Sequence, residues 1–440
     1  MVQVHVSPLN IKVFKLKYPK INKNLFIENR KKIIKKIKPN SLILINSNYT
    51  MPTNEDGNMP FKQNSDMFYL SGINQEKTTL IIYPDAKEES YKEILFIEKI
   101  DKEKIIWEGK KCTKKEAYNI SGIKTCLWIE NFENIFKKLM NDTEYVYLNT
   151  NEHPRASIDI ESKDSKFIKW CKNKYPLHKY ERIAPIIHNL RKIKSKYEIE
   201  LIKKACKITE MGIKRIIPII KPGIMEYEIE AELIHEFIRL RSNGFSFNPI
   251  IASGKNSCIL HYLNNNKKCK SGEIVLVDVG TDYSNYSSDI TRVFPVNGRF
   301  TKRQKNVYNS VLKIIKKAKK IINSNKCINN YNKEILETIK EELIKLKLIN
   351  IKKKNIEYKK YFMHGITHHL GISTHDVGNM NNKFEEGMVF TIEPGIYIKN
   401  ENIGIRLEND ITIKNNKIED ISGNIPIEIE EIEYMMNKPK

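Results

Sequence analysis

Two predicted β-hairpins in the second half of the chain carry acidic residues inside apolar strands, and this feature most constrains the fold. The first hairpin, residues 272–296, has β-branched arms around the turn-rich segment 281–288, with Asp278 and Asp289 on opposite arms. If the turn is centred between residues 283 and 284, the two carboxylates face each other with Cβ atoms about 4.5–5.5 Å apart. Such opposed charges are destabilising in an apolar hairpin unless a cation lies between them.

The second hairpin, residues 388–413, repeats the arrangement. Its two strand-like arms flank the turn-like segment 399–402, and Glu393 and Glu408 are equidistant from a centre between residues 400 and 401. One opposed pair is weak evidence, because surface hairpins often carry acidic residues. Two pairs with apolar neighbours on both arms indicate that the four carboxylates serve one site.

A histidine-rich segment, residues 362–376, holds four of the ten histidines of the chain. His364 and His368 have the i, i+4 spacing of a helical metal pair, but Gly365 and Gly371 argue against a stable helix. Four carboxylates with one or more histidines suit two divalent ions such as Mn²⁺, Zn²⁺ or Co²⁺. A carboxylate that bridges two metals is the usual arrangement of two-metal hydrolases, so we interpret the histidines as completing a dinuclear site.

Composition limits the class of protein. A hydrophobic content of 40% over 440 residues is typical of a globular chain, and no apolar run approaches the ~18–20 residues that span a bilayer. The seven cysteines are scattered and include no C-x-x-C pair, which favours a reducing compartment, the cytoplasm or alternatively an organelle matrix. The net charge of +23 comes from lysines spread along the chain, so we expect neither a specific nucleic-acid site nor membrane association.

Changes in composition and in hydrophobic periodicity along the sequence predict three regions. Residues 1–20 are basic and contain no acid, and we interpret them as an N-terminal extension. Residues 21–176 mix helical segments with short strand-like runs and are typical of a small α/β domain. Residues 177–440 combine helices separated by the segment 221–223, strand pairs and two lysine-rich helices, which indicates a second domain.

Several motifs together resemble aminopeptidase P, the Xaa-Pro aminopeptidase family of the pita-bread metallopeptidases. They occur in family order and spacing as ILHY (259–262), LVDVG with SSDITRVFPVNGRFT (276–301), FMHGITHHLGISTHDVG (362–378), MVFTIEPGIYI (388–398) and NIGIRLENDI (402–411). MPFKQNSDMFYLSGI (59–73) resembles the N-terminal domain signature. The resemblance implies an N-terminal α/β domain of the creatinase/prolidase type, followed by a C-terminal pita-bread α+β domain with a curved antiparallel sheet.

The resemblance implies two divalent metal ions per chain, with Mn²⁺ favoured. Asp289 and Glu408 would bridge the ions, and the implied ligands are Asp278, Asp289, His368, Glu393 and Glu408. This set contains the four carboxylates that the hairpins indicate. The adjacent His369 is expected to be a packing or surface residue.

The resemblance implies roles for five further residues near the metals. His261 and His375 would contact the scissile peptide. His364 would line the proline pocket, and Tyr397 and Arg406 would support proton movement. A shorter loop at residues 379–387, and Ala184 in place of an arginine before Pro185, depart from the family pattern.

The implied reaction is the release of an N-terminal residue that precedes proline in a peptide substrate. A hydroxide between the metals would attack the carbonyl carbon, Glu393 would carry the proton to the leaving nitrogen, and His375 would stabilise the oxyanion. Three alternatives stay open. They are a dipeptide-restricted prolidase, an aminopeptidase that trims non-proline N-termini, and an inactive pita-bread protein that acts as a binding module.

The resemblance also implies subunit contacts over the site. Asp56 and Trp107 lie in segments that would reach the substrate pocket of a neighbouring subunit, in residues 54–61 and 105–111. A large aromatic residue in a charged stretch can anchor such an interface. We therefore expect a homo-oligomer, either a tetramer or a dimer.

Overall fold

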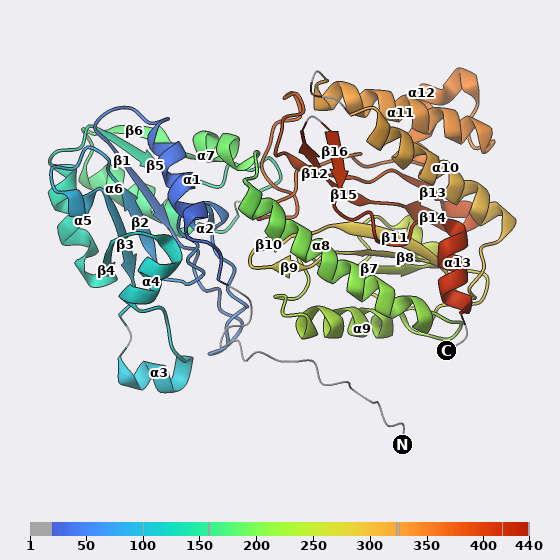
Figure 1. Cartoon of the computed structure of the whole chain (residues 1–440), viewed down its shortest axis with the longest axis horizontal. Helices are drawn as coiled ribbons and strands as arrows, with labels where there is room; N and C mark the ends of the chain where they lie inside the picture. Colours follow the sequence, from blue (N-terminus) through green and yellow to red (C-terminus); the bar gives the residue numbers. More distant parts are fainter. Residues whose placement is uncertain are drawn as a thin grey trace. The chain divides into compact units, whose positions relative to one another are not determined.

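The computed structural model of the protein describes residues 20–99, 101–156, 159–322, 324, 326–415 and 417–438. The predicted extension at residues 1–20 lies outside the described residues, except for its last residue. The described chain forms two compact units, an amino-terminal unit of Ile21–Ile193 and a carboxy-terminal unit that begins at Lys194 (Figure 1).

A six-stranded mixed sheet forms the amino-terminal unit, in the order β4-β3-β2-β1-β5-β6. Antiparallel pairs join the central strands β1, β2 and β3, and parallel pairs add β4, β5 and β6. Their bounds are β1 Ser41–Asn46, β2 Thr79–Ile82, β3 Glu93–Ile97, β4 Thr125–Trp128, β5 Tyr145–Leu148 and β6 Lys179–Arg182. The strand-like runs predicted from the sequence, residues 41–46, 78–83, 93–98 and 145–150, correspond to β1, β2, β3 and β5.

Helices alternate with these strands along the chain. They are α1 Asn24–Ile34, α2 Ser65–Ser71, α3 Lys102–Glu108, α4 Lys114–Ser121, α5 Phe132–Met140, α6 Lys163–Lys174 and α7 Ala184–Arg191. Alternate apolar residues of β1 to β3 and β5 face α5 and α6, because side chains of a strand point to opposite faces in turn. The sequence prediction drew the boundary at residue 176, whereas β6 pairs with β5 and belongs, with α7, to the amino-terminal unit.

Antiparallel strands form the centre of the carboxy-terminal unit. The sheet orders are β11-β8-β7, β12-β15-β16, β13-β14 and β10-β9, and each described pairing is antiparallel. The bounds are β7 Ile250–Ser253, β8 Ile274–Val279, β9 Asp282–Tyr283, β10 Tyr286–Ser287, β11 Ile290–Pro295, β12 Val389–Ile392, β13 Gly395–Ile398, β14 Ile403–Arg406, β15 Asn409–Lys414 and β16 Lys417–Asp420.

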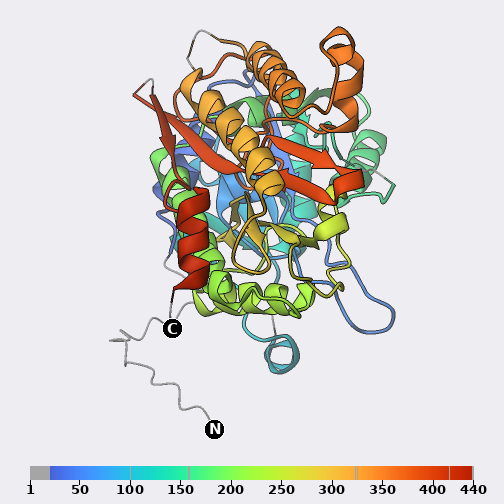
Figure 2. The same ribbon diagram turned by 90° about the vertical axis from the view of Figure 1, so that its right-hand side faces the viewer.

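Helices pack around these strands (Figure 2). They are α8 Lys196–Ile216, α9 Glu226–Arg239, α10 Lys302–Lys320, α11 Ile328–Lys345, α12 Lys354–Glu357 and α13 Ile429–Asn437. Capping boxes begin α8 at Ser195 and α10 at Thr301. Helix α9 packs on β7, which pairs with β8, and α10 packs on β12, β13 and β14, which flank Glu393 and Glu408 in the sequence.

The first hairpin differs from its predicted register. Asp278 pairs with Thr291 rather than with Asp289, so the predicted direct opposition of the two aspartates is wrong. The turn is centred between Ser284 and Asn285, whose φ angles of 54° and 66° are typical of a two-residue hairpin turn. Asp289 therefore lies diagonal to Asp278 on the same face of the hairpin, at a typical Cα separation of about 7–8 Å.

The second hairpin keeps the predicted register. Gly395 pairs with Arg406 on one side, and Ile392 pairs with Asn409 on the other. Both pairs are symmetric about the predicted centre between residues 400 and 401. Glu393 and Glu408 fall in the short gap between the two ladders, where their side chains can leave the plane of the sheet.

Candidate metal centre

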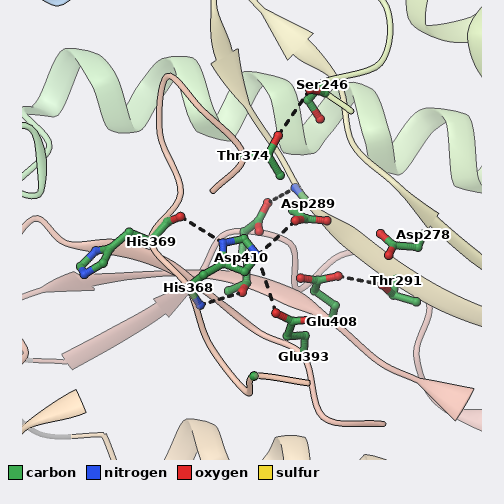
Figure 3. Close-up of polar contacts among 12 residues, drawn as sticks. Ser246, Asp278, Asp289, Thr291, His368, His369, Thr374, Glu393, Glu408 and Asp410 are labelled. Atoms are coloured by element: carbon green, nitrogen blue, oxygen red, sulfur yellow. Dashed lines mark hydrogen bonds and ion pairs between the residues drawn. The ribbon is translucent and has the colours of Figure 1, made fainter. Parts of the chain in front are cut away.

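Five side chains from different elements converge on one side of the carboxy-terminal strands (Figure 3). The five are Asp278, Asp289, His368, Glu393 and Glu408. Asp278 belongs to β8; Asp289, Glu393 and Glu408 lie next to strand ends; and His368 lies in the segment between residues 360 and 389. One potential ligand atom from each of Asp289, His368 and Glu408 lies within 4.8 Å of the others. His368 Nε2 is 3.3 Å from Asp289 Oδ2 and 3.7 Å from Glu393 Oε1.

Backbone contacts fix the orientation of the His368 ring. Its Nδ1 lies 3.0 Å from the carbonyl oxygen of His369, so Nδ1 carries the proton and donates it. Nε2 then faces Asp289 and Glu393. The segment is not helical, as the two glycines predicted, and it is held to β12 because Thr391 N–H donates to the His368 carbonyl at 2.9 Å.

The carboxylates are buried with little positive charge around them. Asp278 Oδ1 and Glu408 Oε1 are buried and have no hydrogen-bond partner among the described residues. Burial first, and neighbouring carboxylates second, raise the pKa of Asp289 and Glu408 well above the usual range. A cation would relieve both effects, and oxygen donors with one imidazole suit a divalent metal, so these residues fit a metal site.

Two residues that the sequence analysis missed support the carboxylates. Thr291 Oγ1 donates to Glu408 Oε2 at 2.7 Å, and Asp410 Oδ2 accepts the N–H of Asp289 at 3.0 Å. Burial raises the pKa of Asp410 to about 7. Each of the two lies two positions after a predicted ligand, Thr291 after Asp289 and Asp410 after Glu408. The period of two along a strand could have identified them.

A chain of hydrogen bonds extends from Asp278 to His364. Arg406 Nη2 donates to Asp278 Oδ2 at 2.5 Å, and Arg406 Nη1 donates to the Tyr397 hydroxyl at 2.7 Å. That hydroxyl lies 2.8 Å from His364 Nε2, and His364 Nδ1 donates to the Gly365 carbonyl at 2.7 Å. Since Nδ1 carries the proton, Nε2 accepts from Tyr397, and four predicted residues form one continuous network.

Burial determines the charge of this network. It lowers the pKa of His364 to about 3, with further lowering by Arg406, so the imidazole is neutral near pH 7. It raises the pKa of Tyr397 to about 12, so the phenol keeps its proton. The network therefore offers one fixed positive charge, at Arg406, and two neutral groups that can exchange hydrogen bonds.

The remaining predicted histidines border the same region. The His375 ring lies 4.4 Å from the His368 ring, nearly perpendicular to it at 87°. His261 follows a 3₁₀ turn at Gly254–Cys258, is exposed, and is near enough to His364 to lower its pKa. His369 is only 2% exposed and packs against Gly378, where a Cβ atom would lie 2.0 Å from the ring.

Two predicted residues belong to the amino-terminal unit. Asp56 is exposed in a loop, and Trp107 is 88% exposed on α3. The five proposed ligands all belong to the carboxy-terminal unit. No described helix is long and apolar enough to cross a membrane.

Comparisons with known proteins match both units. The description "Metallopeptidase family M24" applies to residues 200–415, and "Aminopeptidase P, N-terminal domain" applies to residues 26–147. The chain is 30% identical to the Xaa-Pro aminopeptidase of Escherichia coli (strain K12) over 434 residues, which cover 94% of this chain and 98% of the relative. It is 29% identical to the human Xaa-Pro aminopeptidase 3 over 412 residues, which cover 90% and 81% of the two chains.

Solved structures give the same result. Pseudomonas aeruginosa aminopeptidase PepP superposes with a TM-score of 0.87 and 28% identity, over 95% of this chain and 98% of that one. A zinc-substituted Escherichia coli aminopeptidase P in complex with product superposes with a TM-score of 0.85 and 30% identity, over 95% and 99%. The similarity therefore extends over both units.

Proposed function

The chain belongs to metallopeptidase family M24, and we propose that the site formed by its carboxy-terminal strands carries out the Xaa-Pro aminopeptidase reaction. The protein is a metal-dependent hydrolase that removes the N-terminal residue from peptides with proline at the second position. The predicted order of an N-terminal α/β domain and a pita-bread domain is confirmed. The observation that carries the proposal is the burial of several carboxylates against His368 with too little positive charge to balance them.

We assign two divalent ions, with Mn²⁺ preferred, to five ligands: Asp278, Asp289, His368, Glu393 and Glu408. The orphaned oxygens of Asp278 and Glu408 support this assignment, as does the position of His368 Nε2 beside Asp289 and Glu393. When bound, such ions lower the pKa of coordinated water toward neutrality and polarise the peptide carbonyl. Asp410 and Thr291 hold the backbone of Asp289 and the side chain of Glu408 in place.

Glu393 is the carboxylate we assign to proton transfer. Its side chain is 18% exposed, against 8% for Asp289, so substrate and water can reach it. Its Oε2 lies 3.7 Å from His364 Nδ1, and its Oε1 lies 3.7 Å from His368 Nε2. Glu393 would take a proton from the attacking water at one oxygen and release it to the nitrogen that leaves with proline.

Histidine donors and one aromatic side chain surround the reacting peptide in this assignment. The His364 ring packs on Phe362 at 4.7 Å between centroids, which supports a role in an apolar proline pocket. His375 and His261 would donate to the carbonyl oxygen as negative charge develops there. The Tyr397 hydroxyl and Arg406 keep His364 in the tautomer with Nδ1 protonated.

We propose that the active form is a homo-oligomer, a tetramer or a dimer. Helix α3 exposes Ile105, Ile106 and Trp107 at 45%, 80% and 88%, which is unusual for such large apolar side chains on one short helix. Lys111 pairs with Glu76, with Glu98 at 3.3 Å and with Glu108 at 2.9 Å, and so anchors the segment after this helix. A second copy would cover these side chains and receive Trp107 near its substrate pocket. All seven cysteines are unpaired, which supports a cytoplasmic location or an organelle matrix.

A peptide panel tests the proposed function. The purified chain is incubated with an Xaa-Pro dipeptide, an Xaa-Pro-Yaa tripeptide and a leucyl peptide without proline, with Mn²⁺ or with a chelator, and the products are identified by mass spectrometry. We expect release of Xaa from both proline peptides with Mn²⁺ only. Cleavage of the dipeptide alone would identify a prolidase, and no cleavage in metal-replete protein would identify an inactive binding module.

A further inference from the structure

Glu226 is a fully buried acid outside the metal centre. It begins α9, is 0% exposed, and accepts five hydrogen bonds through its two carboxylate oxygens. Oε1 accepts from Ser253 N at 2.7 Å, Ser253 Oγ at 2.8 Å and Asn256 Nδ2 at 3.3 Å. Oε2 accepts from Tyr262 Oη and from Lys267 N, both at 2.8 Å.

The carboxylate has no ion-pair partner among the residues that the structure describes. Lys267, whose backbone N–H donates to Glu226, directs its Nζ to Glu273 at 2.6 Å. Five donors and the N-terminus of α9 therefore stabilise the buried charge of Glu226. A carboxylate is the only side chain that offers acceptors alone, so no neutral residue can satisfy all five donors.

The five hydrogen bonds close the segment 253–267 into a loop. Lys267 completes the closure, because Glu226 N–H donates to its carbonyl at 3.0 Å while its own N–H donates to Glu226. His261 lies inside this loop, directly before the bonded Tyr262. The position of the His261 side chain thus depends on a loop whose polar contacts meet at one carboxylate.

The same loop contacts a strand of the metal centre. Ser257 Oγ accepts the N–H of Gly404 in β14 at 2.8 Å, and a Cβ atom at position 404 would lie 2.0 Å from the Ser257 carbonyl oxygen. Only glycine allows this approach. Since β14 ends at Arg406, the loop is held beside the network that joins Arg406 to His364.

We propose that Glu226 is a positioning residue for His261. Its carboxylate ties together Ser253, Asn256, Tyr262 and Lys267, and the closed loop holds His261 where it can donate to the carbonyl oxygen of the substrate. The inference rests on the proposed function for the role of His261. The coupling between Glu226 and the loop is testable without any catalytic activity.

Glu226→Gln is the most informative variant, because it keeps the shape of the side chain and changes only its hydrogen-bonding groups. Whichever way the amide is turned, its NH₂ group faces either the N–H of Ser253 or the N–H of Lys267, and neither backbone donor can reverse. One buried donor therefore loses its acceptor. Glu228→Gln is the matched control, since Glu228 is exposed on the same helix and bonds only to Met225 N, at 2.7 Å, among the contacts described.

Hydrogen exchange and kinetics are measured together on full-length, metal-loaded protein. In Glu226→Gln we expect at least about tenfold faster amide exchange in peptides from residues 254–267, and no change in residues 364–376. We expect kcat/KM for an Xaa-Pro-Yaa peptide to fall about tenfold or more, with unchanged metal content. In a His261→Ala background, Glu226→Gln should lower kcat/KM by less than about twofold, because both substitutions act through the His261 imidazole.

Two results would overturn the inference. One is an equal fold-loss of kcat/KM in both backgrounds, which would mean that Glu226 acts on the fold in general. The other is unchanged exchange in residues 254–267. If Glu226→Gln does not fold, Tyr262→Phe serves instead, because it removes only one of the five hydrogen bonds. It must show the same changes in amide exchange and in kcat/KM, with smaller magnitudes. A wild-type protein without Xaa-Pro cleavage would refute the proposed function, while the exchange result would still decide whether Glu226 holds the loop.

Discussion

Replacing Arg406 should destabilise the carboxy-terminal unit more than any surface ion pair can. Arg406 is 4% exposed and donates to Asp278 at 2.5 Å, to Tyr397 at 2.7 Å and to Thr291 at 3.2 Å. Arg406→Leu leaves a buried carboxylate and a buried phenol without their donor. Breaking a buried pair in this way costs about 3–5 kcal/mol.

The assay is thermal and urea unfolding of chelated, metal-free protein, in which no ion can compensate Asp278. In a unit of this size about 1 kcal/mol shifts Tm by roughly 2–4 °C, so Arg406→Leu should lower Tm by about 6–20 °C. Arg406→Lys keeps the positive charge but lacks the planar guanidinium with its several donors, so its Tm should lie between those of Arg406→Leu and the wild type.

Arg303→Leu is the matched control. Arg303 binds both oxygens of Glu401, at 2.7 and 2.8 Å, but is 35% exposed. Its loss should cost less than about 1 kcal/mol. If Arg406→Leu costs no more than this control, the argument that Arg406 balances a buried carboxylate is wrong.

Four further predictions concern the metal centre and the oligomer. Glu393→Gln should keep its metal but lose about 10²–10⁴ in kcat, and near-normal turnover in metal-replete protein would contradict its role in proton transfer. Asp289→Ala should lower metal stoichiometry measured after dialysis, and two ions per chain would disprove bridging. Trp107→Ala should raise KM for tripeptides and be partly rescued by mixing with an active-site variant, whereas a fully active monomer in light scattering would exclude the arrangement. In chelated protein, the raised pKa of Asp289 and Glu408 makes the folded chain bind more protons than the unfolded chain. The free energy of unfolding, measured by urea denaturation at a series of pH values, should therefore decrease as pH rises above about 4. If Asp289→Asn leaves the slope of that free energy against pH unchanged, the prediction is wrong.

The ligand-bearing hairpins were predictable because their signals are local. Strand periodicity and turn residues lie within a few positions of each other, so the register about residues 400–401 follows from the sequence alone. The first turn was misplaced by one residue because Ser284 and Asn285 both adopt positive φ, and several polar residues nearby could have done so equally well. The error changed the partner of Asp278 but not the face on which it lies.

The supporting residues were not predictable in the same way. Glu226 lies 27 residues from Ser253 and 41 from Lys267 along the chain, and no local pattern links them. At the start of a helix, a glutamate ordinarily indicates an interaction with the helix dipole and nothing more. Only the packing of α9 on β7 turns it into an acceptor for five donors of another segment.

Burial separates the acidic side chains of the metal centre in a way that matches the roles proposed for them. Among the three side chains with ion pairs here, Glu393 is 18% exposed, Asp278 12% and Asp289 8%. A group that exchanges protons with water and substrate must be reachable, whereas a bridging ligand gains from the low dielectric that strengthens its attraction to a cation. Glu393 also follows β12, in the gap between the β12–β15 and β13–β14 ladders. The difference in burial thus supports assigning proton transfer to Glu393 and bridging to Asp289.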